Sequence, residues 1–234
     1  MKKLALISLL ACLMTGCHIN LNGETKWTYE HPERYTVGDA TLTQTINDID
    51  ISWLEGNIDI VYADHPDVRI YEVTDSALSD SLRMHWYVDD DGCLDIRFCK
   101  SGSYKTNHLN NLGKRLTVEV PRGTVLNAID MDIVSASVKI DSVVCNELSV
   151  DGISFDILAS YQERLPNEID IDGVNCEINI NMASNAGMTI DMDGVKSNLN
   201  CSIPSTKSGK KTVIGDGACK VDFDGVNCTL NINK

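Results

Sequence analysis

The sequence has few basic residues, no Cys-x-x-Cys pair, and no apolar run long enough to cross a bilayer. Its main apolar run, Leu4 to Met14, is too short for a hydrocarbon core of about 30 Å. The 20 Lys and Arg residues are outnumbered by 34 Asp and Glu residues, and the net charge of −14 argues against nucleic-acid binding. Without Cys-x-x-Cys, a structural zinc site is not expected, and we predict no cofactor.

Signatures of catalysis are missing as well. None of the five histidines lies beyond His108, and none sits in a recognisable nucleophile motif. The calcium-binding repeat pattern GGxGxD is also absent. We therefore predict that the protein is not an enzyme and assign it no catalytic, cofactor-binding or metal-binding residue.

What the sequence does contain begins with MKKLALISLLACLMTGC, in which two lysines and an apolar stretch precede small residues. This pattern is typical of a secretory signal peptide. The Met-Thr-Gly-Cys ending resembles a bacterial lipobox, which implies cleavage before Cys17 and lipidation of Cys17. We predict a signal peptide over residues 1–16, a tether over residues 17–38, and a lipid-anchored protein of the bacterial cell envelope. The alternative is an ordinary secretory signal. The outer membrane is the favoured location, and the sequence leaves open whether the protein faces the periplasm or the cell exterior.

Residues 39–121 are predicted to form N-terminal strands and a hairpin. Apolar and polar residues alternate with period two from Ile46 to Val73. Two further alternating runs, between Leu82 and Lys100, are joined by Asp-Asp-Asp-Gly, which indicates a hairpin whose glycine has a positive φ. The run RLTVEVPRGT adds one more strand, ended by Pro121.

Residues 122–234 carry a repeat of about 20 residues. If its second Asp is position 0, apolar residues recur at −3, −1, +2 and +6 in every copy. Position 0 is occupied by Asp132, Asp151, Asp172, Asp193 and Asp224. The alternation shifts by one residue between 0 and +2, so a corner or bulge is expected there, and the glycine at +1 of four copies permits it. Ser52 fits position 0 of an earlier copy.

A unit made only of strand and corner cannot bury its inner face alone, so its copies must stack. Stacked copies would pair as parallel strands about 4.8 Å apart, with like residues in register. We predict an all-β fold: a parallel β-helix, or β-solenoid, of about 20-residue coils with an irregular N-terminal β cap, in one domain over residues 39–234. A two-sheet β-sandwich is the alternative. The extra residues from Pro204 to Val213 are expected to form a basic loop.

The order of these segments resembles a bacterial domain of unknown function called the "putative adhesin" domain. The resemblance rests on the strand entry Glu55–Ile60, the strand Gly92–Ile96, the run Val118–Pro121 and the coils that follow. It implies an exported β-helical protein. It brings no catalytic residues that could be transferred to this chain.

The aspartates at positions −2 and 0 are predicted to form outward-facing ladders along the stack. Stacked carboxylates could hold Ca²⁺, a cation that prefers oxygen ligands. Aspartate also suits a solvated corner, and two charges about 4.8 Å apart in water repel by less than about 1 kcal/mol. Binding of Ca²⁺ by the ladder stays open.

Seven of the nine cysteines follow Cys17. Cys176 and Cys228 share position +4, which places both in the core. If the copies stack in chain order, one copy lies between theirs and the two cysteines are roughly 9.6 Å apart. This separation is too large for a disulfide, so we predict that these thiols are free. Pairing of Cys145 with Cys219 stays open.

The aromatic residues gather in the first half of the chain, among them Trp27, Trp53 and Trp86. We interpret them as a cap over the open end of the stack; the alternative is a platform on which saccharides stack. The sequence thus predicts a non-enzymatic binding, adhesion or scaffold role, with the membrane reached through Cys17. An envelope protein or a glycan is the candidate partner. The alternative function is a carbohydrate-active enzyme on a β-helix fold.

Overall fold

A computed structural model describes residues 17–19, 25–102, 112–183 and 185–234. The predicted signal peptide, residues 1–16, lies outside the described residues. Within the described ranges all elements are strands apart from one short 3₁₀ helix, η1 (Pro32–Arg34). No helix in these ranges is long and apolar enough to cross a membrane. The all-β prediction is confirmed.

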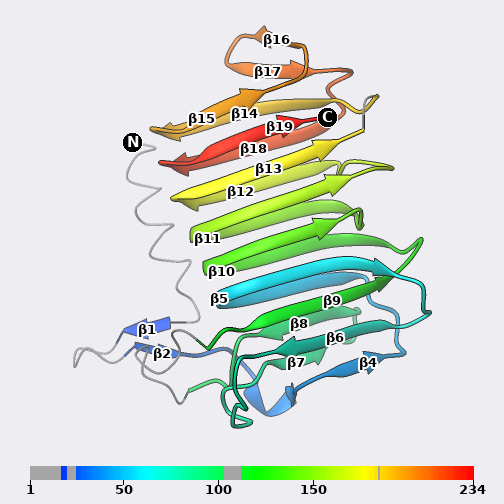
Figure 1. Cartoon of the computed structure of the whole chain (residues 1–234), viewed down its shortest axis with the longest axis vertical. Coiled ribbons are helices and arrows are strands. Elements are labelled where there is room, and N and C mark those ends of the chain that lie inside the picture. The colour runs from blue at the N-terminus through cyan, green and yellow to red at the C-terminus, as the bar shows by residue number, and fades with distance from the viewer. Residues whose placement is uncertain (1–16, 20–24, 103–111, 184) are drawn as a thin grey trace.

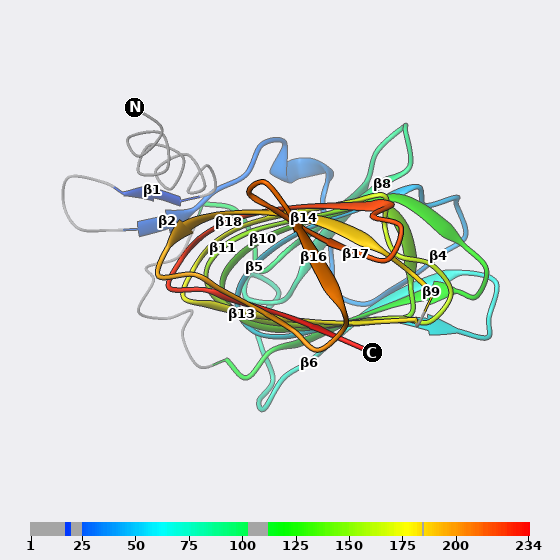
Figure 2. The ribbon, with the colours of Figure 1, turned by 90° about the horizontal axis from the view of Figure 1, so that it is seen from above.

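Two walls of strands face each other across one core (Figures 1 and 2). Three long, bent strands belong to both walls: β5 (Asp48–Ala63), β10 (Val125–Asp141) and β11 (Val144–Tyr161). The first wall contains the first halves of these three strands. It also contains β3 (Thr36–Val37), β7 (His85–Val88), β8 (Cys93–Arg97), β12 (Glu168–Val174), β18 (Cys219–Val226), β14 (Met188–Val195), β17 (Lys211–Ile214) and β16 (Ser205–Ser208). The second wall contains the second halves of β5, β10 and β11. It also contains β4 (Ala40–Leu42), β6 (Val68–Val73), β9 (Arg115–Pro121), β13 (Cys176–Met182), β19 (Thr229–Asn233) and β15 (Asn198–Cys201).

Copies of the repeat that are neighbours in space pair in parallel, with like positions in register. Asp132 lies opposite Asp151 on one side and opposite Ser52 on the other. Asp151 in turn lies opposite Asp172. The predicted register is therefore confirmed, including the early copy around Ser52.

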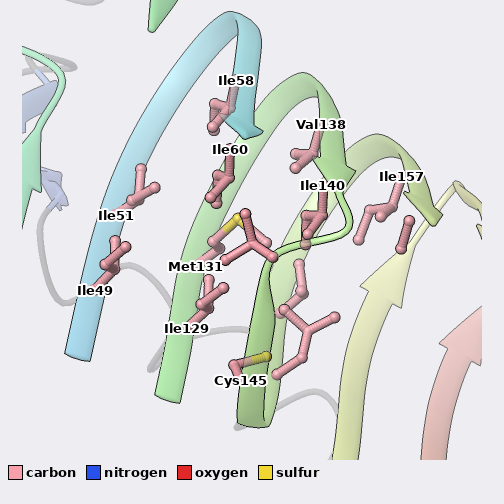
Figure 3. Close-up of a cluster of buried hydrophobic side chains, with 14 of the residues drawn as sticks. Ile49, Ile51, Ile58, Ile60, Ile129, Met131, Val138, Ile140, Cys145 and Ile157 are labelled. Carbon is pink, nitrogen blue, oxygen red and sulfur yellow. The ribbon is translucent and has the colours of Figure 1, made fainter. Parts of the chain in front are cut away.

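The apolar columns that result fill the space between the walls. Ile49 and Ile51 lie on one limb of β5, and Ile58 and Ile60 lie on the other limb (Figure 3). All four are fully buried. The two limbs of each copy thus bury each other's apolar face.

The C-terminal copy is inserted out of chain order. β12 and β13 pair with β18 and β19, and β14 and β15 pair with the far sides of β18 and β19 (Figure 1). Cys176 and Cys228 therefore belong to adjacent copies, and the predicted separation of two places is wrong. The segment between β15 and β18 lets the chain turn back, and strand periodicity alone carries no information on that reversal.

The basic segment Pro204–Val213 is also different from the prediction. It forms an antiparallel hairpin, β16 and β17, rather than a loop. Residues Met188–Ile190 of β14 pair with β17, and Lys211 Nζ lies 3.3 Å from an oxygen of Asp191. The hairpin thus covers part of the outermost copy.

The corner of the repeat lies later than predicted. Position +2 is not buried in any copy, and Val195 is 49% exposed there. The inward residues are instead those at +1, such as Ile133, and those at +4, such as Phe155. The turn between them falls at +3, where Asn175 and Asn227 have left-handed φ values of 57° and 60°.

Close packing explains Gly152 and Gly173 at +1, because neither has a positive φ, whereas Gly194 at the same position has a φ of 145°. A Cβ on Gly152 would lie 2.5 Å from Phe155 Cδ1 and 2.6 Å from the carbonyl oxygen of Ile133. A Cβ on Gly173 would lie 2.7 Å from Cys176 Sγ. Glycine at +1 therefore makes room for the inward side chain at +4.

The N-terminal strands enclose a buried ion pair. Lys114 Nζ contacts Glu72, and the two side chains are 0% and 2% exposed. The ammonium group also donates to the Phe98 carbonyl oxygen and lies 4.2 Å from the Phe98 ring centroid. Burial lowers the pKa of Lys114, and Glu72 opposes that shift. The Glu72 carboxylate also accepts a hydrogen bond from the Met84 amide.

The predicted tether contacts the rest of the domain from Trp27 onward. The short strands β1 (Cys17–Ile19) and β2 (Thr25–Trp27) pair with each other. The Gly102 amide donates to the Trp27 carbonyl oxygen over 2.8 Å, and β3 pairs with β7. Trp27 and Tyr29, which lie in the stretch predicted as a tether, pack against the core.

Candidate functional site

A cleft of about 870 Å³ lies where the segment 27–35 faces outward-pointing residues of the first wall. Its floor contains residues of four neighbouring strands: β8, β5, β10 and β11. The lining from these strands includes Asp50, Ser52, Asp95, Arg97, Asp132 and Asp151. The cleft thus forms at the junction between the N-terminal strands and the repeat.

Three tyrosines form a row along the cleft. The ring centroids of Tyr29 and Tyr35 are 4.6 Å apart, and those of Tyr35 and Tyr87 are 5.7 Å apart. The Arg34 guanidinium lies 5.9 Å from the centroid of the Tyr87 ring. Burial raises the pKa of Tyr29 and Tyr35, so both are neutral phenols at neutral pH. The row offers apolar ring surface beside polar edges.

Arg97 is the centre of the polar part of the cleft. Its Nη1 lies 2.6 Å from Asp50 Oδ1 and also donates to Ser52 Oγ. Its Nη2 donates to Asp95 Oδ1 over 3.0 Å, and the other oxygen of Asp95 accepts a hydrogen bond from Tyr35. Burial alone would lower the pKa of Arg97, but Asp50 and its neighbours raise it. This network fixes the guanidinium in one position.

The remaining carboxylates of the floor are partly desolvated. Burial raises the pKa of Asp132, and the charge of Asp50 adds to that shift. Burial, together with the neighbouring Asp172 and Asp132, raises the pKa of Asp151 to about 6. Asp95 also has a raised pKa, first through burial, although Arg97 opposes the shift. These carboxylates are held close together with less water than an open surface provides.

The cleft is acidic as a whole. Its lining holds six carboxylates and two guanidinium groups: Glu30, Asp50, Asp89, Asp95, Asp132, Asp151, Arg34 and Arg97. A phosphate-rich or sulfated ligand would therefore be repelled. Neutral or cationic ligands are compatible with this charge.

Several buried donors around the cleft have no partner within the described ranges. They are Trp27 Nε1, the Tyr29 hydroxyl and Arg97 Nε. Trp27 is only 6% exposed. Because buried polar groups are nearly always hydrogen-bonded, these three groups are candidate partners for a molecule bound in the cleft.

The structure separates the three tryptophans singled out in the sequence. Trp27 lines the cleft, whereas Trp53 is fully buried, with its ring centroid 4.9 Å from that of Phe98. Trp86 is half-buried against the core. The tyrosines supply most of the aromatic surface of the cleft, and Trp53 belongs to the core.

Sequence reasoning missed the role of Arg97 and Asp95. Both face outward on β8, and Asp95 lies opposite Asp50 in the neighbouring strand. The alternation of Asp95, Ile96 and Arg97 in the sequence signalled which face they occupy. The pairing of β8 with β5, which brings them to the ladder, had no sequence signal.

The aspartate ladder faces outward as predicted, and only its first rungs line the cleft. Within the described part of the chain, no three His, Cys, Asp or Glu residues are arranged to hold a metal ion. The predicted lipidation site, Cys17, lies directly opposite Trp27 in the β1–β2 pair. The backbone of Cys17 is therefore one strand away from a residue of the cleft.

No family model matches the sequence, and no curated protein matches it significantly. The structure is similar to that of a "putative cell adhesion protein" from Clostridium sporogenes, with a TM-score of 0.65 and 14% identity over 85% of this chain and 99% of that chain. For a "putative adhesin" from Bacteroides fragilis, the TM-score is 0.39 and the identity 16%, over 86% and 97% of the two chains. For a "putative lipid binding protein" from Parabacteroides distasonis the values are 0.26 and 12%, over 84% and 97%. The first similarity shows a shared fold, and the other two scores are too low to support an argument.

Proposed function

We propose that the protein is a lipid-anchored β-solenoid of the bacterial cell envelope that binds a neutral saccharide in the cleft and does not turn it over. The in-register parallel pairing of bent strands supports the solenoid over two independent sheets. The shared fold with the Clostridium sporogenes protein is compatible with an adhesive role.

The observation that carries the saccharide proposal is the combination of an aromatic row with fixed polar groups in one cleft. Sugar rings present an apolar face that stacks on tyrosine, and their hydroxyls both donate and accept hydrogen bonds. In such a complex the carboxylates of Asp132 and Asp151 would accept hydrogen bonds from sugar hydroxyls, and the Arg34 guanidinium would donate hydrogen bonds to them. A few fixed polar groups beside aromatic surface are typical of small-molecule sites.

The carboxylates of the cleft argue for binding rather than hydrolysis. Asp50, Asp132 and Asp151 occupy the ordinary ladder positions of the repeat, and Arg97 holds Asp50 and Asp95 in ion pairs. A hydrolase needs one acid and one base with distinct environments, whereas these carboxylates follow the regular pattern of the repeat or are held in ion pairs.

One observation favours the enzyme as a second candidate. The raised pKa of Asp151, about 6, would suit a general acid beside the neighbouring Asp132. Release of reducing ends from a bound oligosaccharide would establish turnover. Binding without release supports the binding protein.

The anchor adds a spatial expectation. Because Cys17 and Trp27 are opposite each other in the β1–β2 pair, a lipid on Cys17 would hold the cleft close to the membrane surface. The ligand would then be a glycan of the same envelope layer. Metabolic labelling with an alkyne-tagged fatty acid tests the anchor: label should appear in the wild-type protein and be lost in Cys17→Ser.

A glycan array probed with the lipid-free Cys17→Ser chain tests the site. We expect binding to one class of neutral oligosaccharide, and roughly two- to tenfold weaker binding when Tyr87→Ala is added, since one aromatic contact contributes about 0.5–1.5 kcal/mol. The matched control is Leu158→Ala, an exposed residue of the second wall that is 43% exposed. Binding only to basic peptides or anionic glycans, or equal loss in both variants, would contradict the proposal.

A further inference from the structure

Position +4 of the repeat forms a column of inward side chains across adjacent copies. In spatial order the column contains Ala136, Phe155, Cys176, Cys228 and Ser197. Two cysteines are thus neighbours in this column. They become neighbours only because the C-terminal copy is inserted between β13 and β15.

The two thiols are in direct contact. Glu177 lies opposite Thr229, so the residues before them, Cys176 and Cys228, face each other across β13 and β19. The Cys176 amide donates to Cys228 Sγ over 3.2 Å, and Cys228 Sγ lies 3.3 Å from the Gly173 carbonyl oxygen. The side chains also hydrogen-bond each other. Both residues are at least nine-tenths buried.

The distance across neighbouring strands suits a covalent link. Opposite residues of adjacent strands lie about 4.8 Å apart, within the roughly 4.4–6.8 Å between the Cα atoms of a disulfide. By contrast, Cys145 and Cys219 come from β11 and β18, which are separated by β12. Cys201 lies opposite Ile232, so no cysteine faces it across the pair.

We propose that Cys176 and Cys228 are oxidised to a disulfide in the exported protein, and that this bond fixes the inserted strand β19 against β13. The bond would close the 52-residue separation between the two cysteines, which includes β14, β15 and the β16–β17 hairpin. The outermost copy pairs with β18 and β19, so the same bond stabilises the far end of the stack. Both cysteines are free thiols in the structure, and the proposal concerns their oxidised state.

The oxidation proceeds by thiol–disulfide exchange with a disulfide-bearing oxidant, either an exported oxidoreductase or oxidised glutathione. The Cys228 thiolate attacks one sulfur of the oxidant, forms a mixed disulfide and expels the first thiolate. Cys176 then gives up its proton and attacks the Cys228 sulfur, which expels the second thiolate. The protein loses two hydrogens, and the oxidant is reduced to two thiols.

The surroundings of Cys228 favour its role as the attacking group. The hydrogen bond from the Cys176 side chain lowers the pKa of Cys228, although burial opposes this, and the Cys176 amide lowers it further. The thiolate is the reactive form in exchange.

Peptide mapping under non-reducing conditions tests the proposal on full-length protein isolated from the envelope of producing cells. We expect a Cys176–Cys228 linked peptide whose mass is 2 Da below the sum of its parts and which separates after reduction. Refolding with oxidised glutathione should give the same link. Unmodified thiols at both positions in both preparations, or a link between other cysteines, would overturn the proposal.

The stability of variants gives a second readout. Reduction should lower the Tm of the wild-type protein by roughly 5–15 °C, as expected for closing a loop of this length. In Cys228→Ser the Tm should no longer respond to reductant, and circular dichroism checks that this variant is folded. The matched control is Cys201→Ser, which should keep the full response. An equal response in Cys228→Ser and wild type would contradict the proposal.

Discussion

The N-terminal strands and the repeat bury their apolar residues in different ways. In the repeat, strands pair in parallel and the same residue types recur along columns, so the outward surface is nearly the same at each copy. In the N-terminal part, antiparallel ribbons extend both walls, and a Lys–Glu pair and aromatic rings lie in the core. The difference teaches that a repeat specifies a stack, and that a distinct site arises where irregular segments cover it.

The aspartate ladder shows this at the level of single residues. Asp151 and Asp172 lie opposite each other and occupy the same position of the repeat. Only Asp151 lines the cleft, because the segment 27–35 reaches the first copies and not the later ones. The repeat supplies the carboxylates, and the N-terminal segment makes some of them part of a site.

The largest expected effect comes from the buried ion pair of the N-terminal part. Lys114→Met leaves the Glu72 carboxylate buried without its partner, and we expect about 3–5 kcal/mol of lost stability in urea unfolding. The control is Arg122→Met, because Arg122 and Asp64 form an exposed pair, with side chains 62% and 85% exposed. That change should have almost no effect. Equal losses would show that the N-terminal core does not depend on the pair.

A comparable test for the repeat uses its close-packed glycine. Gly173→Ala should cost about 1–3 kcal/mol under reducing conditions, because the new methyl would overlap Cys176 Sγ. Adding Cys176→Ala removes that overlap, so the double variant should lose less than the sum of the two single changes. Additive losses in urea unfolding would contradict close packing as the reason for glycine.

The corner at +3 should give a smaller effect. Asn175→Ala keeps a left-handed residue without the asparagine side chain and should cost about 1 kcal/mol, whereas Asn175→Gly should be close to neutral. Ser154 occupies the same position in β11 without a positive φ, so Ser154→Ala is the matched control. A cost in Ser154→Ala equal to that in Asn175→Ala would show that backbone conformation does not set the effect.

The smallest expected effect is the dependence of stability on pH that the aspartate ladder causes. Burial first, and neighbouring carboxylates second, raise the pKa values of Asp130, Asp151 and Asp172 to about 6. These groups bind protons more tightly in the folded chain than in the unfolded chain, where their pKa is about 3.9. Their stabilising contribution is therefore full below about pH 4 and is lost as the pH rises through about 6.

The Tm should consequently be a few degrees higher at pH 5 than at pH 7, a modest effect because these groups are only partly buried. In Asp151→Asn the difference should shrink. Differential scanning fluorimetry at pH 5, 6 and 7 measures both. A Tm that rises steadily from pH 5 to pH 7 would contradict the raised pKa values.

Periodicity made much of the wall predictable. The apolar columns at −3, −1 and +6, the parallel register and the early copy at Ser52 all follow from residue alternation, which directly reflects which side chains face inward. Position +2 was assigned to the core wrongly, because alternation locates a shift of phase but not the residue that turns. The left-handed asparagine at +3 was visible in two copies, in Asn175 and Asn227.

Two further features could not be read from the sequence. The insertion of β18 and β19 between earlier and later copies depends on which edge accepts the returning chain, and all edges of the repeat are alike. The cleft depends on long-range packing of Tyr29 and Tyr35 on Arg97 and its partners, for which no local pattern exists. The sequence predicts the repeating part best, and the cleft lies where the irregular N-terminal part meets the repeat.

The central claim is that a ligand binds at the junction of the N-terminal strands and the repeat. Hydrogen exchange measured by mass spectrometry tests it most directly, on the lipid-free chain with and without the neutral oligosaccharide selected by the array. We predict added protection in peptides covering residues 27–35, 85–97 and 130–134, and no change in residues 186–217. Protection confined to residues 186–217, or spread evenly along the ladder, would contradict the account.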